Sequence, residues 1–302
     1  MKVGGPFAFS GPLATRDNIL STVGHLEQLG FDHVWMGEHV YHPREMSQPY
    51  PYTLDGHLPY DPDENFLEIV TTYGFVAAVT DRLRLHTNIL MPAMRQPFLA
   101  GMHLATLDYL SQGRLNVGVG LGWMPEEYAL AGVPWTARGV YLDEWILAVR
   151  AFMNGEAFEG RFYRFREGHF APRPVQRPFP IWIGGDSDAA VRRAALLGDG
   201  WQPVGPVNAI ERAAWLRPRL SRIAELRDSQ GRDTTRFPIM TGFAFDRSEL
   251  ARTLDGLAAP ADSGVTHINV RFGELNTAAP LSSIFDDAAW VAHHIVTAAH
   301  RF

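Results

Sequence analysis

Short apolar runs alternate with amphipathic stretches along most of the chain. The runs are rich in β-branched and aromatic residues, as buried parallel strands are, whereas the other stretches repeat apolar residues every three or four positions. Eight strands are predicted, at residues 2–10, 33–39, 83–91, 115–122, 181–183, 200–205, 238–245 and 267–272. Eight helices are predicted, near residues 19–30, 66–79, 98–110, 142–153, 190–197, 210–227, 249–257 and 288–299.

This alternation over 302 residues predicts an α/β fold with one domain, the closed (β/α)8 TIM barrel. An open, doubly wound sheet is the alternative. Such sheets bind dinucleotides through a glycine-rich fingerprint after the first strand, and this chain has no such fingerprint there. The barrel is therefore the preferred interpretation.

Two segments interrupt the alternation. Residues 40–64 have no period and are rich in proline and tyrosine. Loops of that length are usually functional lids or disordered, and the aromatic content favours a lid. In residues 155–180, before the fifth strand, phenylalanines and a tyrosine are interleaved with arginines. This pattern can bind single-stranded nucleic acid, but it also fits a two-stranded excursion with buried aromatic rings and solvated arginines.

The charge balance favours the excursion. With 27 basic and 33 acidic side chains the formal net charge is −6, which argues against a general affinity for nucleic acid or anionic membranes. No apolar run approaches the ~20 residues of a membrane helix. The chain has no cysteine, so disulfides, thiolate nucleophiles and thiolate metal sites are excluded, and the reducing cytoplasm is the expected compartment.

Residues 181–187 combine a strand, a glycine turn and a helix start. Gly184 and Gly185 follow the apolar run, and Ser187 is placed to cap the next helix. Without Cβ atoms a ligand can approach the backbone, and the free N–H groups of a helix start attract anions, most often phosphate. Two glycines can equally make a tight turn and nothing more.

Other polar residues fall at predicted strand ends, where the reactive groups of a TIM barrel lie. His39 ends the second strand and can exchange a proton at neutral pH, or it can be a structural histidine. His42 gives a His-x-x-His spacing, but no acidic zinc motif follows, so no metal site is expected. Asn88 can form a bulge or simply end the third strand, and Arg95 can bind an anion or neutralise a helix end.

The fourth strand ends in alternating glycines. Gly118, Gly120 and Gly122 leave room for a flat ring against the backbone, or for large side chains inside the barrel. Glu126 and Glu127 follow, and either carboxyl group is a candidate acid.

Several separate stretches together resemble one family, the bacterial luciferase-like flavin and deazaflavin oxidoreductases. The resemblance covers about residues 1–205, in the order and spacing of the family. It lies in residues 35–39, 81–86, 105–114, 118–127, 172–176 and 181–201.

This resemblance implies a barrel with one tricyclic redox cofactor at its C-terminal mouth. In the family the ring rests on a third-strand bulge that often holds a non-proline cis peptide, and the matching bond is Asn88–Ile89. His39 matches the histidine beside the reacting face of the ring. The resemblance places the cofactor phosphate at Gly184, Gly185 and Ser187.

The Gly-Trp-x-x-Glu-Glu motif at residues 122–127 and the Arg-x-Pro motif at residues 95–97 are similar to those of F420-dependent members of the family. Hydride transfer between coenzyme F420 and a small organic substrate is therefore the first hypothesis. Trp123 stands where members that act on sugar phosphates carry a carboxylate, which implies a flatter, more apolar substrate. Because family members are commonly dimers, a homodimer is expected.

Two other functions stay open. An FMN-dependent monooxygenase of the same fold would use FMNH2 supplied by a separate reductase and would activate O2 at the same ring. A barrel can also carry a cofactor without turning over a substrate.

Overall fold

Eight parallel strands form a barrel in the computed structural model, which describes residues 1–51, 53, 55–58, 60–206, 209–271 and 280–302. The strands follow one another around the barrel in the order β8-β7-β4-β3-β2-β1-β10-β9, and Trp201 pairs with Ile239 to join β8 to β9. The predicted TIM barrel is confirmed. The strands are β1 (Lys2–Pro6), β2 (His33–Met36), β3 (Arg84–Thr87), β4 (Leu115–Val119), β7 (Ile181–Gly184), β8 (Gly200–Gln202), β9 (Met240–Phe243) and β10 (His267–Val270).

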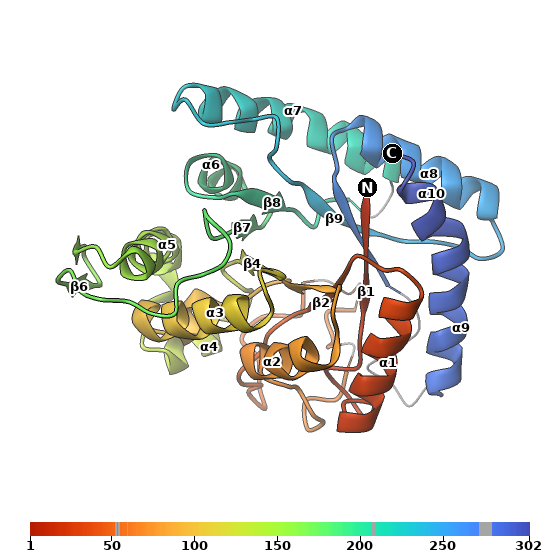
Figure 1. The fold of residues 1–302 in the computed structure, drawn as a ribbon, viewed down its shortest axis with the longest axis horizontal. Coiled ribbons are helices and arrows are strands. Elements are labelled where there is room, and N and C mark those ends of the chain that lie inside the picture. Colours follow the sequence, from red (N-terminus) through yellow and green to blue (C-terminus); the bar gives the residue numbers. More distant parts are fainter. Residues whose placement is uncertain (52, 54, 59, 207–208, 272–279) are drawn as a thin grey trace.

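Helices lie between the strands and cover the outside of the barrel (Figure 1). The long helices are α1 (Arg16–Gln28), α2 (Ile69–Val79), α3 (Pro97–Leu110), α5 (Arg138–Asn154), α6 (Asp188–Leu196), α7 (Ala209–Asp228), α8 (Leu250–Asp262) and α9 (Leu281–Val291). Short helical segments are η1 (Pro92–Met94), α4 (Pro125–Leu130), η2 (Trp135–Ala137), η3 (Ala292–Val296) and α10 (Thr297–Ala299). Within the described ranges, no helix combines the length and apolarity needed to cross a membrane.

The predicted strands are too long at their C-terminal ends. The pattern continues to residue 39 after β2 and to residue 91 after β3, whereas the regular strands end at Met36 and Thr87. Beyond β3 the pairing is irregular: the chain bends at the cis peptide, and an isolated bridge then pairs Leu90 with Val119. Residue 272 of the predicted eighth strand, like residues 52, 54 and 59 of the predicted lid, lies outside the described residues.

Some helix limits also differ from the prediction. The second helix begins at Ile69 rather than at residue 66, because the Glu68 carboxylate caps it by accepting from the N–H groups of Val70 and Thr71. The last predicted helix begins earlier, at Leu281. The sequence pattern gave no sign of α4, which is only six residues long.

The excursion before the fifth barrel strand is two-stranded, as predicted. β5 (Phe158–Glu159) pairs antiparallel with β6 (Arg164–Phe165), and the hairpin projects beside α5 (Figure 1). The rings of Phe158 and Phe165 stack at 5.7 Å, and Phe165 also packs on Phe152 of α5. The arginines of the segment are exposed, so the aromatic rings face inward and the charges are solvated.

The barrel interior is filled partly by polar side chains. His33 Nε2 donates to Asn269 Oδ1 at 2.7 Å, and His86 Nε2 donates to Gln202 Oε1 at 2.6 Å. The Trp182 ring packs edge-on against His86 and His267, at 4.7 and 5.0 Å. Glycines make room for these side chains, because a Cβ atom at position 4 would overlap the imidazole of His33.

The three interior histidines are held neutral. Burial lowers the pKa of His33 to about 4 and that of His267 to about 3, and it lowers the pKa of His86 well below its ordinary value. Neighbouring imidazoles and arginines act in the same direction on His86 and His267. Protonating any of them would place a charge inside the barrel.

We therefore expect the free energy of unfolding to fall as the pH is lowered from 7 to 5. The unfolded chain takes up protons on these histidines near pH 6.5, whereas folded His33 and His267 do so only near pH 4 and 3. Between these values the unfolded state binds more protons, so each histidine destabilises the fold by about 2 kcal/mol at pH 5. Urea unfolding at the two pH values measures the loss.

His267→Asn should remove about 2 kcal/mol of this pH dependence. His169→Asn, at an exposed histidine of the excursion, is the matched control and should leave the dependence unchanged. Equal stability of the wild-type protein at both pH values would contradict the assignment.

Candidate functional site

The C-terminal ends of β2, β3, β4 and β7 are neighbours, and they bring most of the predicted site residues to one mouth of the barrel. Ile89 follows β3, and its side chain lies between the ends of β4 and β7. A Cβ atom at Gly120 would lie 3.1 Å from Ile89 Cδ1, and one at Gly184 would lie 2.8 Å from Ile89 Cγ2. The Asn88–Ile89 peptide is cis, as the resemblance implies. The half-buried Ile89 side chain and the glycines beside it thus form an apolar floor at the mouth.

The turn after β7 exposes backbone beside this floor. Gly185 has φ of +112°, a conformation that favours glycine, and it is partly exposed. Ser187 Oγ accepts from the N–H of Ala190 at 3.2 Å, which confirms the predicted cap of α6. The Asp186 carboxylate turns away to accept from the N–H of Val204 at 2.8 Å. The first N–H groups of a helix have no carbonyl partner within it, so the start of α6 can attract an anion.

His39 lies at the same mouth, between a carboxylate and an indole. Its Nδ1 is 3.3 Å from Glu127 Oε2, and Trp123 Nε1 donates to its Nε2 at 3.4 Å. The His39 side chain is 12% exposed and that of Glu127 is 0% exposed. His39 therefore contacts a buried carboxylate through Nδ1 and an indole N–H through Nε2.

Glu127 reaches this position because Pro125 starts α4 only a short loop, residues 120–124, after β4, which places the first turn of the helix at the mouth. Glu127 Oε1 also accepts from the backbone N–H of Val40 at 3.0 Å. Sequence reasoning named Glu127 only as a candidate acid and missed its partnership with His39. Its neighbour Glu126 instead accepts from the backbone N–H of Ser47 at 2.6 Å.

The two partners determine the tautomer of His39. An indole N–H can only donate, and a carboxylate can only accept. Neutral His39 therefore carries its proton on Nδ1, and its Nε2 lone pair is the acceptor. A hydroxyl group that displaces the Trp123 indole from Nε2 would meet a proton acceptor held in position.

Arg95 is already paired with two carboxylates, so it is not available to bind another anion. Neutralising a helix end is also not its only role. Its Nη1 donates to Glu38 Oε2 at 2.8 Å, and it also pairs with Glu68. Burial raises the pKa of Glu38, although Arg95 and the N–H of Met91 act to lower it. Burial also acts to raise the pKa of Glu68, but the N–H groups of its helix and Arg95 hold it at about 2. This cluster fixes the loop after β3 to the end of β2.

The loop of residues 40–64, hereafter the lid loop, packs over His39. His42 Nε2 lies 3.0 Å from the hydroxyl of Tyr60, its ring centroid is 5.1 Å from that of His39, and burial lowers its pKa. Farther along the loop, the Gln48 amide donates to the carbonyl of Trp123, and the Tyr50 ring meets the Trp123 ring edge-on at 5.3 Å. The described part of the loop thus covers the site, as a lid would.

The alternating glycines have different neighbours. A Cβ atom at Gly118 would overlap the Gln202 side chain inside the barrel, so Gly118 serves barrel packing. Gly120 faces Ile89 at the floor of the mouth. Gly122 has φ of +65° beside Met91 and turns the chain toward α4.

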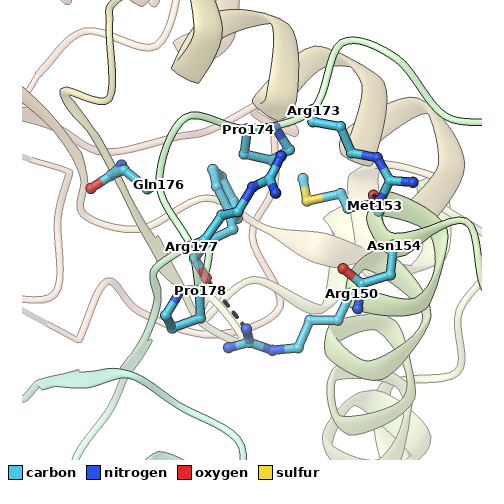
Figure 2. Close-up of a pocket in the computed structure, with 9 residues that line it drawn as sticks. Arg150, Met153, Asn154, Arg173, Pro174, Gln176, Arg177 and Pro178 are labelled. Atoms are coloured by element: carbon cyan, nitrogen blue, oxygen red, sulfur yellow. Dashed lines mark hydrogen bonds between the residues drawn. The ribbon is translucent and has the colours of Figure 1, made fainter.

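Two pockets adjoin the described residues. One of about 430 Å³ lies between the lid loop and the segment after β4, and Trp123 is part of its wall. The other, of about 220 Å³, lies beside the C-terminal part of α5, where Arg150, Arg173 and Arg177 reach toward it (Figure 2). Arg150 pairs with Asp199 at 2.6 Å, and Arg173 donates to the Met153 carbonyl at 3.0 Å. Arg150 and Arg173 thus hold the structure together at this second pocket. We therefore take the mouth, where the predicted site residues meet, as the candidate site.

The chain is similar to several known proteins. A family model described as luciferase-like monooxygenase matches residues 6–255. An uncharacterized protein of Mycobacterium tuberculosis is 34% identical over 253 residues, 82% of each chain. An F420-dependent glucose-6-phosphate dehydrogenase of Beutenbergia cavernae is 32% identical over 194 residues, which are 62% of this chain and 52% of that enzyme. An FMNH2-dependent dimethylsulfone monooxygenase of Pseudomonas putida is 35% identical over 154 residues, which are 49% and 42%.

Solved structures share the fold. An F420-dependent secondary alcohol dehydrogenase in complex with an F420-acetone adduct has a TM-score of 0.76 at 15% identity, over 99% of this chain and 98% of that one. The monooxygenase RslO1 of Streptomyces bottropensis has a TM-score of 0.74 at 23% identity, over 98% and 99%.

The geometry predicts that Glu127 fixes the tautomer of His39. In protein labelled with ¹⁵N-histidine at alkaline pH, the His39 signals should show a protonated Nδ1 and an unprotonated Nε2. Glu127→Gln should allow the Nε2–H form to appear, because an amide can donate as well as accept. Long-range ¹H–¹⁵N correlation spectra measure both forms, and His39→Gln assigns the signals.

Glu126→Gln is the matched control, since that carboxylate holds the lid loop and not the imidazole. It should leave the His39 tautomer unchanged. A dominant Nε2–H form in the wild-type protein would contradict the arrangement.

Proposed function

Because this chain belongs to the luciferase-like monooxygenase family, we propose that it is an F420-dependent oxidoreductase that transfers hydride between the deazaflavin ring and a small organic substrate. The comparisons support the class, an oxidoreductase with a flavin or deazaflavin cofactor, through relatives of both kinds. One observation supports a ring-and-phosphate cofactor in this chain, and the resemblance of its motifs to F420-dependent members favours F420. An apolar floor, a glycine turn at a helix start and a buried His39–Glu127 pair share one mouth of the barrel.

The residues at the mouth fit such a cofactor. Ile89, with the cis peptide from Asn88, and Gly120 would support the ring, because no side chain stands on the backbone at position 120. The phosphate would be held by the backbone at Gly184 and Gly185, which carry no side chain, and by the hydroxyl of Ser187 at the start of α6. When bound, F420 would accept or deliver a hydride.

The chain's own residues would handle the proton. His39 is the proposed catalytic residue, and its Nε2 would accept the proton of a substrate hydroxyl after the Trp123 indole yields its place. Glu127 would keep Nδ1 protonated and stabilise the imidazolium that forms. Trp123 would contact the substrate, and the lid loop would exclude water from the site. In the reverse direction the same imidazolium would return the proton.

The runner-up function is a monooxygenase that uses reduced FMN. The Pseudomonas putida relative carries that cofactor in its name, and the same floor and turn would accept an FMN ring and phosphate. In that case a separate reductase must supply FMNH2, because the cofactor has to arrive reduced.

Cofactor titration tests the proposal. We expect F420 to bind at micromolar concentration and FMN to bind more weakly, as followed by quenching of tryptophan fluorescence. Gly185→Ala should weaken F420 binding about tenfold or more, because its backbone conformation is strained for alanine and the added methyl group would crowd Ala190 at 3.3 Å, which would shift the turn. Gly168→Ala, where a Cβ atom would have no neighbour within 4 Å, is the control.

Micromolar binding of FMN without binding of F420 would replace the first function by the second. His39→Ala distinguishes an enzyme from a protein that carries a cofactor without turning over a substrate. That change should abolish turnover of an identified substrate and leave cofactor affinity within a few fold.

We propose further that the protein is a homodimer of the cytoplasm, the compartment that its lack of cysteine favours. Apolar side chains remain exposed on the outer face of α3, where Tyr109 is 57% and Leu110 68% exposed. Phe98, Leu99 and Met102 extend the same face. An apolar helix face of this extent is typical of an interface.

Met102→Asp combined with Leu110→Asp should therefore convert the dimer to a monomer, because each carboxylate would be buried without a partner. Sedimentation velocity measures the mass. Val204→Asp places the same charge on an exposed apolar residue near β8 and should leave the dimer intact. A wild-type protein that sediments as a monomer would refute the dimer.

A further inference from the structure

The pocket beneath the lid loop has apolar walls and a cation at its edge. Gln48 and Pro49 of the loop, Leu121 and Trp123 after β4, and Trp135 and Arg138 at the start of α5 line about 430 Å³. This volume is in the range of small-molecule sites. Arg138 is the charged member of the lining among the described residues.

Arg138 is held in place but has no carboxylate partner. Its guanidinium lies 3.9 Å from the centroid of the Trp135 ring, and its Nη1 donates to the Trp135 carbonyl at 2.8 Å. In the part of the chain that the structure describes, no Asp or Glu pairs with it. A guanidinium left unpaired in a chain of net charge −6, and fixed on an indole, is prepared to bind an anion.

The platform under Arg138 is itself fixed. The Trp135 ring meets the Tyr128 ring edge-on at 5.1 Å, and the Tyr128 hydroxyl donates to the Leu121 carbonyl at 2.6 Å. Tyr128 is buried, so the start of α5 is tied to the segment after β4. The cation therefore keeps its place relative to the pocket wall.

The same wall reaches His39. Trp123 lines the pocket, and its Nε1 donates to His39 Nε2 at 3.4 Å. A flat molecule lying against this indole would have one end near Arg138 and another near the proton acceptor. A pocket with an anion-binding group at one end, a proton acceptor at the other and aromatic walls between them is typical of a substrate site.

We propose that this pocket binds the substrate, and that the substrate is a flat, apolar molecule with an anionic group, such as an aromatic carboxylate. Arg138 holds the anionic group with two N–H donors, and the rings of Trp123 and Trp135 contact the apolar body. The inference rests on the proposed function and adds the substrate class to it.

Binding of two matched probes tests the inference. Isothermal titration of the full-length protein with 1-naphthoate and with neutral 1-naphthamide should give about tenfold tighter binding of the carboxylate. Arg138→Met should remove this preference by weakening naphthoate about tenfold, and should leave naphthamide unchanged. Arg138→Gln, which keeps a polar side chain, should act in the same way.

Arg161→Met is the matched control, because Arg161 also lies over an aromatic ring, that of Phe162 at 5.2 Å, but belongs to the excursion. It should keep the preference for naphthoate. Equal affinity of the two probes in the wild-type protein, or an unchanged preference in both Arg138 variants, would overturn the inference.

A third arm separates the substrate from the acidic tail of a cofactor. If Arg138→Met weakens F420 or FMN tenfold and leaves naphthoate unchanged, the pocket holds the cofactor tail and the inference is wrong. The probes carry no redox group, so their result is independent of cofactor binding. Failure of either proposal can therefore be recognised without the other.

Discussion

A buried carboxylate joins the segments that form the mouth of the barrel. Glu127 comes from the helix after β4, yet it accepts from the backbone at Val40 and from the imidazole of His39, both of which follow β2. A fully buried carboxylate requires such partners, because leaving it unpaired would cost several kcal/mol. The lid loop, the indole of Trp123 and the pocket wall are arranged around this contact. Its loss would free His39 to rotate and would leave the loop without an anchor at its first residue.

The barrel below the mouth is filled in an equally specific way. Histidine, asparagine and glutamine side chains take part of the space that branched apolar layers fill in most TIM barrels, and glycines on other strands leave room for them. These imidazoles must remain neutral. The fold therefore has a stability that depends on pH, and the hydrogen bonds tie strands together across the barrel interior.

The barrel could be predicted from sequence because strand and helix periods alternate locally, and because C-terminal ends of parallel strands always meet at one mouth. That rule predicts His39 and Gly184 at the same mouth, and the family resemblance adds Ile89. It could not pair His39 with Glu127, since 88 residues separate them and no period links the two. The partner of His86 was equally hidden, because Gln202 lies 116 residues away across the barrel.

The exact strand ends and the pocket at Arg138 could not be predicted from the sequence either. An apolar pattern continues past the end of regular pairing at Thr87, because Leu90 and Met91 remain buried and an isolated bridge still pairs Leu90 with Val119. No sequence motif marks Arg138. It becomes a candidate only in the structure, because no carboxylate among the described residues pairs with it and its guanidinium lies on the Trp135 ring.

A crystal structure with the bound cofactor tests the central claim most directly. The account predicts the tricyclic ring on Ile89, the phosphate on the turn at Gly184 and Gly185, and His39 beside the reacting face. A ring bound elsewhere, with that turn free of phosphate, would contradict it.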